Sequence, residues 1–531
     1  MTNPRTNGVI FPLQTMNGRH HTASFLLVMA LGLCFYLPLL TRNYDINGLM
    51  EAAAVESGNP VDMWNPNHML YRPVGYLVRQ TLVAAGIHTS VVPFLQILSA
   101  IFGALGLGFV FLVLEYLTSN RTIAIWMSLA LGASWSWWTL STDVYYFSMA
   151  AMFVAAMLAV FVRAESVGAL VLCGLLAGLS ILTCEANVVL IPGLGIAVLL
   201  RNPSQQIRKS IQGIIWLWIS AGATVGTAFV GAAVLVYQRR TIHSILDWAT
   251  NYSGTRLPMW GTWWPPSRLP QALGSAFKSV FAMDFGMFPF FVRHLRNGEL
   301  PAWVAPLGFF IVAGILIVAF RKGSAESNSR NRTLLWLLIL YGTYIPFVTW
   351  WESVEARWYI LANVFLAALI AMLLTQWSKW PYFRIALPAG VLTLAGMNLI
   401  LSSGPKHFRQ SNASMMAACV ADHMKPDDLF LATEWNWADY LHSIHSREMV
   451  SFLGEVSAAS RNKEAAMQKI SSIMHERQQH GAHVYMIDIS SYPADYMKWL
   501  NEQTGLTVED LKRYKGTPAF ECVGSGFIKL D

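Results

Sequence analysis

Acidic residues follow the first long apolar run of the chain within a few positions. The run ends near Leu40, and Asp45 and Glu51 come soon after it, before an Ala-rich stretch. A carboxylate held at the membrane surface could remove the proton from the hydroxyl group of an acceptor. Asp is also a favoured residue at a helix N-terminus, and for Asp45 taken alone capping is the simpler explanation.

Two further loops contain polar residues that could contact a substrate. His68 and Arg72 lie in the long loop 42–88, and Asp143 and Tyr145 lie in the next short loop on the same side. The plain alternatives are a solvated histidine and an arginine whose head group reaches water from a membrane-surface helix. For Asp143, a role in metal or acid–base chemistry and simple loop capping remain comparable explanations.

Arginines and tryptophans gather in the long segment 237–301. Guanidinium groups suit the recognition of phosphate, although anionic lipid head groups would attract them as well. Another arginine stands directly before a late apolar run, where it could contact a lipid phosphate. The residues that we select as candidate phosphate ligands are Arg239, Arg240, Arg256 and Arg357.

The elements that must position these residues are helices in a membrane. Hydrophobic residues make up 54% of the chain and charged residues 13%, against roughly 45–50% and 25% in a soluble domain. The apolar runs are about 18 to 25 residues long, which favours spanning helices over a barrel. The net charge of +7 is explained by basic cytoplasmic loops, so we do not expect nucleic acid as a partner.

The apolar pattern predicts about eleven spans and a polytopic α-helical membrane domain over residues 1–402. Short loops on one side contain Lys and Arg, whereas 141–145 and 184–186 contain none, so the N-terminus is placed inside and 403–531 outside. Residues 272–300 contain an interrupted apolar stretch, 281–291, that is too short to span. We predict that 272–300 is re-entrant or interfacial; a true span there would invert the tail. The predicted spans are 24–41, 89–116, 122–140, 146–163, 167–183, 187–200, 212–236, 302–320, 333–350, 358–377 and 384–402.

The tail, residues 403–531, is predicted to be a small extracytoplasmic α/β domain. Strand-like and helix-like pieces alternate in it, and we expect them at 429–433, 437–442, 448–452, 461–479, 483–489, 494–504 and 520–530. Cys419 and Cys522 could form a disulfide if the tail is outside the cytoplasm. The expected location of the protein is a bacterial inner membrane.

Three segments together resemble the GT-C superfamily of glycosyltransferases, and in particular bacterial relatives of protein O-mannosyltransferases. Tyr44-Asp45 with Glu51 resembles the acidic motif of the first outer loop, and residues 67–76 are similar to the stretch that follows it. Residues 136–145 resemble an aromatic segment ending in Glu-Val-Tyr, with Asp143 in place of Glu. Arg357 with the next two residues echoes an Arg-Tyr pair before a late span.

The resemblance implies a GT-C-like bundle that transfers a sugar from a polyprenyl-phosphate carrier in the bilayer to a glycan, lipid or protein acceptor. Asp45 would be the general base of a single, inverting displacement. Asp143 would position substrate or, with Asp45, hold a divalent cation such as Mg or Mn. The arginines would neutralise the departing phosphate. The residues expected to contact substrate are Glu51, His68, Arg72, Asp143, Tyr145, Arg239, Arg240, Arg256 and Arg357.

Two other classes of function fit parts of the pattern. A lipid-linked glycan transporter or flippase would also have many spans and arginines, but transporters place charged groups near the bilayer midplane and often contain repeats. Here the acids gather at one face and no repeat is evident, which favours an enzyme. A receptor or scaffold would use a carbohydrate-binding surface in the tail around Glu434, Trp435, Trp437 and Asp439; a strand end followed by a helix start explains these residues equally well.

Overall fold

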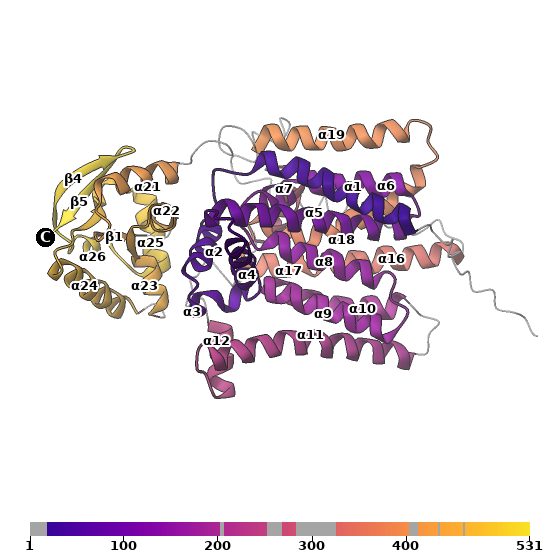
Figure 1. The fold of residues 1–531 in the computed structure, drawn as a ribbon, viewed down its shortest axis with the longest axis horizontal. Coiled ribbons are helices and arrows are strands. Elements are labelled where there is room, and N and C mark those ends of the chain that lie inside the picture. Colours follow the sequence, from indigo (N-terminus) through magenta and orange to yellow (C-terminus); the bar gives the residue numbers. More distant parts are fainter. Residues whose placement is uncertain are drawn as a thin grey trace, which may run out of the picture.

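The computed structural model describes residues 18–201, 207–251, 268–282, 325–402, 412–433, 436–459 and 462–531. A long bundle of helices occupies most of the molecule, and a smaller α/β part lies at one end of it (Figure 1). The helices before the α/β part are α1 Gly18–Tyr36, α2 Ile46–Ser57, α3 Pro60–Met63, α4 Tyr71–Ala84, α5 Val91–Thr118, α6 Arg121–Ala133, α7 Trp135–Ser141, α8 Phe147–Phe161, α9 Val167–Thr183, α10 Leu190–Arg201, α11 Ile207–Leu235, α12 Ile242–Asn251, α13 Arg268–Phe281, α16 Ala325–Gly342, α17 Tyr344–Trp351, α18 Tyr359–Leu374 and α19 Phe383–Ser402.

Six helical stretches of the described residues are long and apolar enough to cross a membrane, and each of them overlaps a predicted span. They are His21–Leu39, Val91–Thr118, Ile207–Leu235, Ser329–Trp351, Ala356–Trp377 and Phe383–Ile400. Two shorter apolar helices, α8 and α9, coincide with two other predicted spans, and a third, α6, covers only the first part of the predicted span 122–140. The predicted span 302–320 and most of the segment 272–300 lie outside the described residues, so the count of eleven stays a prediction.

The predicted span 122–140 is wrong as a single helix. The chain leaves the helical conformation at Ser134, which has φ −64° and ψ 146°, and α6 and α7 lie on either side of it. The two helices have 13 and 7 residues, so neither alone has the roughly 20 residues that a span needs. The break redirects α7, which leads directly into the loop that contains Asp143.

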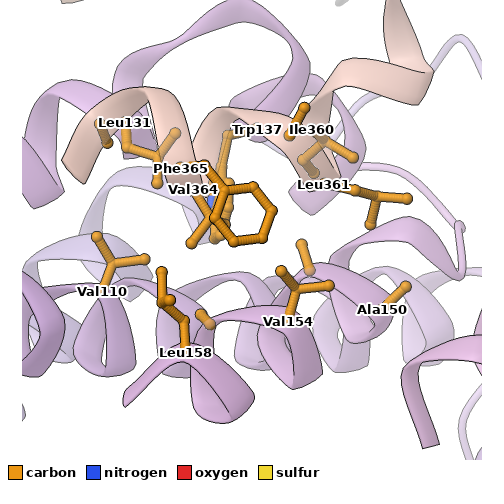
Figure 2. Packing of buried hydrophobic residues seen from close by; sticks show 14 of the residues in the cluster. Val110, Leu131, Trp137, Ala150, Val154, Leu158, Ile360, Leu361, Val364 and Phe365 are labelled. Carbon is orange, nitrogen blue, oxygen red and sulfur yellow. The ribbon is translucent and has the colours of Figure 1, made fainter. Parts of the chain in front are cut away.

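The core of the bundle lies between α5, α8 and α18. Side chains of Val110, Val154 and Phe365 face one another there (Figure 2). Trp137 of α7 is fully buried beside them, and a Cβ atom at Gly106 would lie 2.8 Å from its ring. The glycine therefore lets α7 approach α5 closely, which fixes the start of the loop 141–145 relative to the bundle.

The C-terminal part is a five-stranded mixed sheet covered by helices. Its strand order is β2-β1-β3-β5-β4, with β1 parallel to β2 and β3, and with β5 antiparallel to β3 and β4. The strands are β1 Leu429–Ala432, β2 Glu448–Ser451, β3 Val484–Ile487, β4 Gly516–Cys522 and β5 Ser525–Leu530. The helices are α21 Asn412–His423, α22 Asn436–His445, α23 Phe452–Ala458, α24 Lys463–Gln479, α25 Ala494–Thr504 and α26 Val508–Leu511.

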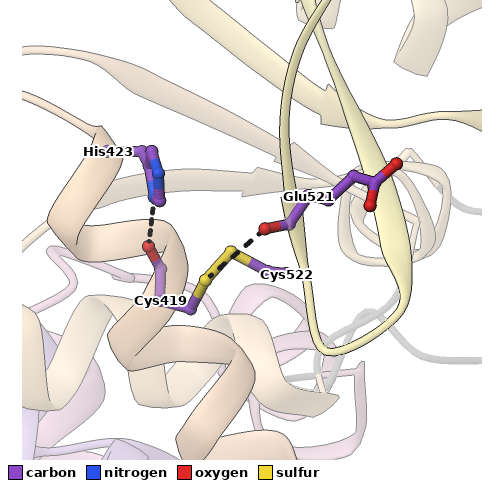
Figure 3. Close-up of a disulfide and its surroundings, with 4 residues drawn as sticks. All are labelled: Cys419, His423, Glu521 and Cys522. Carbon is purple, nitrogen blue, oxygen red and sulfur yellow. Dashed lines mark hydrogen bonds between the residues drawn. A yellow bond between two sulfur atoms is a disulfide. The ribbon is translucent and has the colours of Figure 1, made fainter.

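The last predicted piece of the tail, 520–530, is a hairpin and not one strand. The chain turns at Val523 and Gly524, which both have positive φ, 50° and 79°. Two successive residues with positive φ are typical of the tight turns that match the twist of paired strands. The expected disulfide between Cys419 and Cys522 is present and joins α21 to β4 (Figure 3).

Candidate active site

Asp45 is the N-cap of α2, at the end of the bundle that faces the C-terminal sheet (Figure 1). Its Oδ1 accepts a hydrogen bond from the backbone N–H of Asn47 at 2.9 Å and another from the Asn47 side chain at 3.0 Å. The simpler explanation of Asp45, helix capping, is therefore confirmed. Capping uses only one carboxylate oxygen, however. The side chain stays 34% exposed, and its other oxygen can contact a further group.

The second oxygen of Asp45 pairs with Arg357, which lies in the short turn before α18. Arg357 Nη1 donates to Asp45 Oδ2 at 3.2 Å, and the same guanidinium lies 3.4 Å from Glu352 and 3.5 Å from Glu355. One cation thus faces three carboxylates. Burial raises the pKa of Glu355, and Glu352 accepts a further hydrogen bond from Trp358 at 3.1 Å.

Asp143 contacts the Asp45 segment from the bundle side. The carboxylate of Asp143 is buried, and its oxygens accept the backbone N–H groups of Asp45 at 2.9 Å and Val144 at 2.7 Å. Burial and the neighbouring Asp45 charge raise the pKa of Asp143 to about 7, against the lowering effect of the two N–H groups. A Cβ atom at Gly48 would lie 2.1 Å from the Val144 carbonyl oxygen, so only glycine allows α2 to lie this close.

Tyr145 connects these groups through its hydroxyl oxygen. That oxygen accepts hydrogen bonds from Asn47 Nδ2 and from Arg357 Nη1, both at 3.1 Å. The buried ring stacks on Tyr146, with centroids 4.7 Å apart, and Tyr146 stacks on His68 at 3.6 Å. Burial raises the pKa of Tyr145, so its hydroxyl stays protonated at neutral pH.

Glu51, His68 and Arg72 are buried beneath the site, which the sequence did not indicate. Arg72 donates to both oxygens of Glu51, at 2.8 and 3.0 Å, so it is not the surface arginine considered above. His68 is not solvated either; burial lowers its pKa to about 4 and keeps it neutral at pH 7. Because Glu51 lies on α2 and Arg72 on α4, their pair holds the two helices together.

The loop arginines are less closely connected to Asp45. Arg239 and Arg240 are exposed just after α11, and the structure gives them no bond to Asp45 or Arg357. Arg256 lies outside the described residues. Arg268, at the start of α13, donates to the Trp351 carbonyl at 3.0 Å, close to the Glu352 loop. Of the four arginines selected from the sequence, the described structure brings only Arg357 to Asp45.

Sequence reasoning did not select three residues that contact the site. Asn47 donates to both Asp45 and Tyr145, and Glu352 and Glu355 flank Arg357. The available signal for the two glutamates was their place in a short loop directly before Arg357. Nothing in the sequence distinguished Asn47 from an ordinary residue of a helix first turn.

The comparisons with known proteins give matches in structure alone. No protein-family model matches the chain, and no curated protein matches it in sequence. The oligosaccharyltransferase of Archaeoglobus fulgidus, tethered with an acceptor peptide containing the NVT sequon, is similar in structure, with a TM-score of 0.54 and 12% identity over 96% of this chain and 74% of that one. The chain has the GT-C fold.

Two further solved structures are similar to this chain. The apo form of the same oligosaccharyltransferase has a TM-score of 0.53 and 13% identity over 95% of this chain and 74% of that one. ArnT from Cupriavidus metallidurans in the apo state has a TM-score of 0.47 and 14% identity, over 96% and 98% of the two chains. The GT-C fold and the six apolar helices make this an integral membrane protein. The GT-C fold itself was predicted from the loop motifs, and that prediction is confirmed.

Proposed function

We propose that this protein is a membrane glycosyltransferase that moves a sugar from a polyprenyl-phosphate carrier to the hydroxyl group of an extracytoplasmic acceptor. The observation that carries the proposal is the contact between Asp45 and Arg357. A partly exposed carboxylate beside a guanidinium supplies a base for the acceptor and a cation for the phosphate of the donor. Asp45 is at the start of α2 and Arg357 is in the turn before α18, in a chain with the GT-C fold.

The reaction that these groups support is a single displacement. Asp45 takes the proton of the acceptor hydroxyl while the acceptor oxygen forms a bond to the anomeric carbon. The bond from that carbon to the phosphate oxygen breaks, and its electron pair stays on the lipid phosphate. Because attack and departure occur on opposite faces, the anomeric configuration inverts.

The remaining residues have supporting parts in this proposal. Arg357 stabilises the charge that grows on the phosphate, and its planar fork suits two phosphate oxygens at once. Asp143 and Tyr145 hold Asp45 and Arg357 in place, while Arg239, Arg240 and Arg256 attract the lipid phosphate to this face. Glu51, His68 and Arg72 act from beneath the site by supporting α2.

A divalent cation, Mg or Mn, fits this donor set through Asp45 and Asp143. Mg²⁺ is commonly bound by one or two carboxylates together with substrate phosphates. In the described part of the chain no third His, Cys, Asp or Glu joins these two within ligand distance, so the donor phosphate would complete the set. The cation would neutralise phosphate charge. The Archaeoglobus oligosaccharyltransferase has been solved in complex with Zn and sulfate, at 11% identity and a TM-score of 0.50.

The outer face of a bacterial inner membrane is the proposed place of the reaction. The Cys419–Cys522 disulfide supports it, since disulfides persist in oxidising compartments and are rare in the cytosol. The C-terminal α/β part, residues 403–531, would therefore lie outside the cytoplasm. A lipid-linked donor would reach Asp45 from the outer leaflet.

The test is sugar transfer by the purified full-length protein from a panel of polyprenyl-phosphate sugars. We expect one donor to be consumed, and Asp45→Asn to lower the rate by at least about 10²-fold. Asp62→Asn is the matched control, because Asp62 is exposed in the same outer loop. Full activity in Asp45→Asn would contradict the proposed base. Movement of labelled lipid across a vesicle bilayer without donor consumption would identify a flippase instead.

A further inference from the structure

The C-terminal sheet part touches the backbone at Asp45. Tyr440 of α22 is 2% exposed, and its hydroxyl donates to the carbonyl oxygen of Tyr44 at 2.6 Å. The same hydroxyl lies 3.4 Å from Asn43 Oδ1. The Tyr44 carbonyl belongs to the peptide bond that joins Tyr44 to Asp45, so the contact is made directly before the candidate base.

A hydrophobic contact accompanies this hydrogen bond. Leu49, one turn into α2, is fully buried, and it belongs to the apolar cluster of the C-terminal part rather than to that of the membrane bundle. The same cluster includes Val420, Phe430 and Leu441. Helix α2 and α22 therefore pack together, and the first turn of α2 is enclosed between the two parts of the molecule.

The peptide group between Tyr44 and Asp45 is held at both ends. Its carbonyl oxygen accepts from Tyr440, and its N–H donates to Asp143 at 2.9 Å. Because a peptide group is planar, fixing its oxygen and its N–H fixes the whole plane. Together with the φ angle of Asp45, −68°, the orientation of that plane sets the direction in which the Asp45 side chain leaves the backbone. The two holding residues come from different parts of the molecule.

We propose that Tyr440 is a positioning residue for Asp45, through which the C-terminal part completes the active site. This rests on the proposed function of Asp45 as the base. With the peptide plane fixed, the carboxylate faces the acceptor before the acceptor binds. Without the Tyr440 hydroxyl, the Asp143 bond alone holds the plane, and the carboxylate samples directions in which it cannot take the proton.

Tyr440→Phe removes only the hydroxyl and keeps the ring packed. In the full-length protein we expect kcat to fall by about tenfold while KM for the donor stays within roughly twofold, since a small misplacement affects the chemical step more than binding. Tyr514→Phe is the matched control. Its hydroxyl lies in the same sheet part and contacts Met467, away from α2. Normal kcat in Tyr440→Phe, or equal losses in both variants, would overturn the proposal.

Hydrogen exchange separates this inference from the proposed function. We expect the backbone amides of residues 43–49 to exchange about tenfold faster in Tyr440→Phe, with no change there in Tyr514→Phe. Unchanged exchange would overturn the positioning role whatever the activity. If the wild-type protein transferred no sugar, the proposed function would be wrong. Faster exchange in Tyr440→Phe would still show that the Tyr440 hydroxyl restrains residues 43–49.

Discussion

The carboxylate of Asp45 and the guanidinium of Arg357 lie 3.2 Å apart although 312 residues separate them in the chain. The pair joins the cap of α2 to the turn that begins α18. In the proposed reaction Arg357 would share its charge between Asp45 and the incoming phosphate. Once the donor is bound, movement of Arg357 toward the phosphate would free the second oxygen of Asp45 to accept the proton of the acceptor.

Arg357→Lys should separate charge from geometry. Lysine keeps the positive charge but cannot reproduce the fork that reaches Asp45 and Tyr145 together. We expect kcat/KM for the donor to fall by roughly 10²-fold. Steady-state kinetics measures this, with Arg513→Lys, an exposed arginine of the C-terminal part, as the control. An activity equal to wild type would show that a positive charge at this position is sufficient and that the planar fork of Arg357 is not needed.

Activity should rise with pH through about 7 because of Asp143. Its pKa is raised to about 7, so the side chain is neutral below that pH and charged above it. A charged Asp143 accepts the backbone N–H of Asp45 more strongly than the neutral acid does, so it holds the Asp45 segment more firmly in the position that the reaction needs. The rate should therefore increase between about pH 5.5 and about pH 8.5, roughly 1.5 units on either side of the pKa of Asp143. The variant Asp143→Asn should not show this increase. If the increase persists in the variant, it is caused by the titration of another group.

Removing one partner of the buried Glu51–Arg72 pair should destabilise the fold. Arg72→Met leaves the Glu51 carboxylate buried without its cation, which costs about 3–5 kcal/mol. Thermal unfolding of the purified protein in detergent measures the loss. The double variant Glu51→Leu with Arg72→Met should recover much of it. The control is Arg477→Met, which breaks an exposed pair with Glu448 and should lower the free energy of unfolding by at most about 1 kcal/mol. A loss as small as this in Arg72→Met would contradict the buried pair.

Local signals in the sequence were enough for many of the described helices and strands and for the position of Asp45. An apolar run ends just before Asp45, and a capping residue is expected where a helix begins, as the structure confirms. The pieces predicted at 429–433 and 494–504 correspond to β1 and α25 within one residue. These features depend on the order of neighbouring residues, which a single sequence contains.

Contacts between distant segments could not be predicted in this way. The burial of His68 depends on Tyr146 stacking against it, and the hold on the Asp45 peptide comes from Tyr440, almost 400 residues away. The break at Ser134 was missed because the apolar pattern continues through it. Whether Asp143, Tyr145 and the loop arginines contact substrate stays a prediction, because their types and positions allow capping and lipid contact as well.

The disulfide of the C-terminal part closes a loop of chain around almost the whole sheet. Cys419 lies in the helix that leads into the sheet and Cys522 at the end of β4, 103 residues later. A single proteolytic cut anywhere between them would leave the two fragments covalently joined until the bond is reduced. Tyr440 lies inside this loop. After one such cut, the disulfide therefore keeps the segment that contains Tyr440 attached to the rest of the protein.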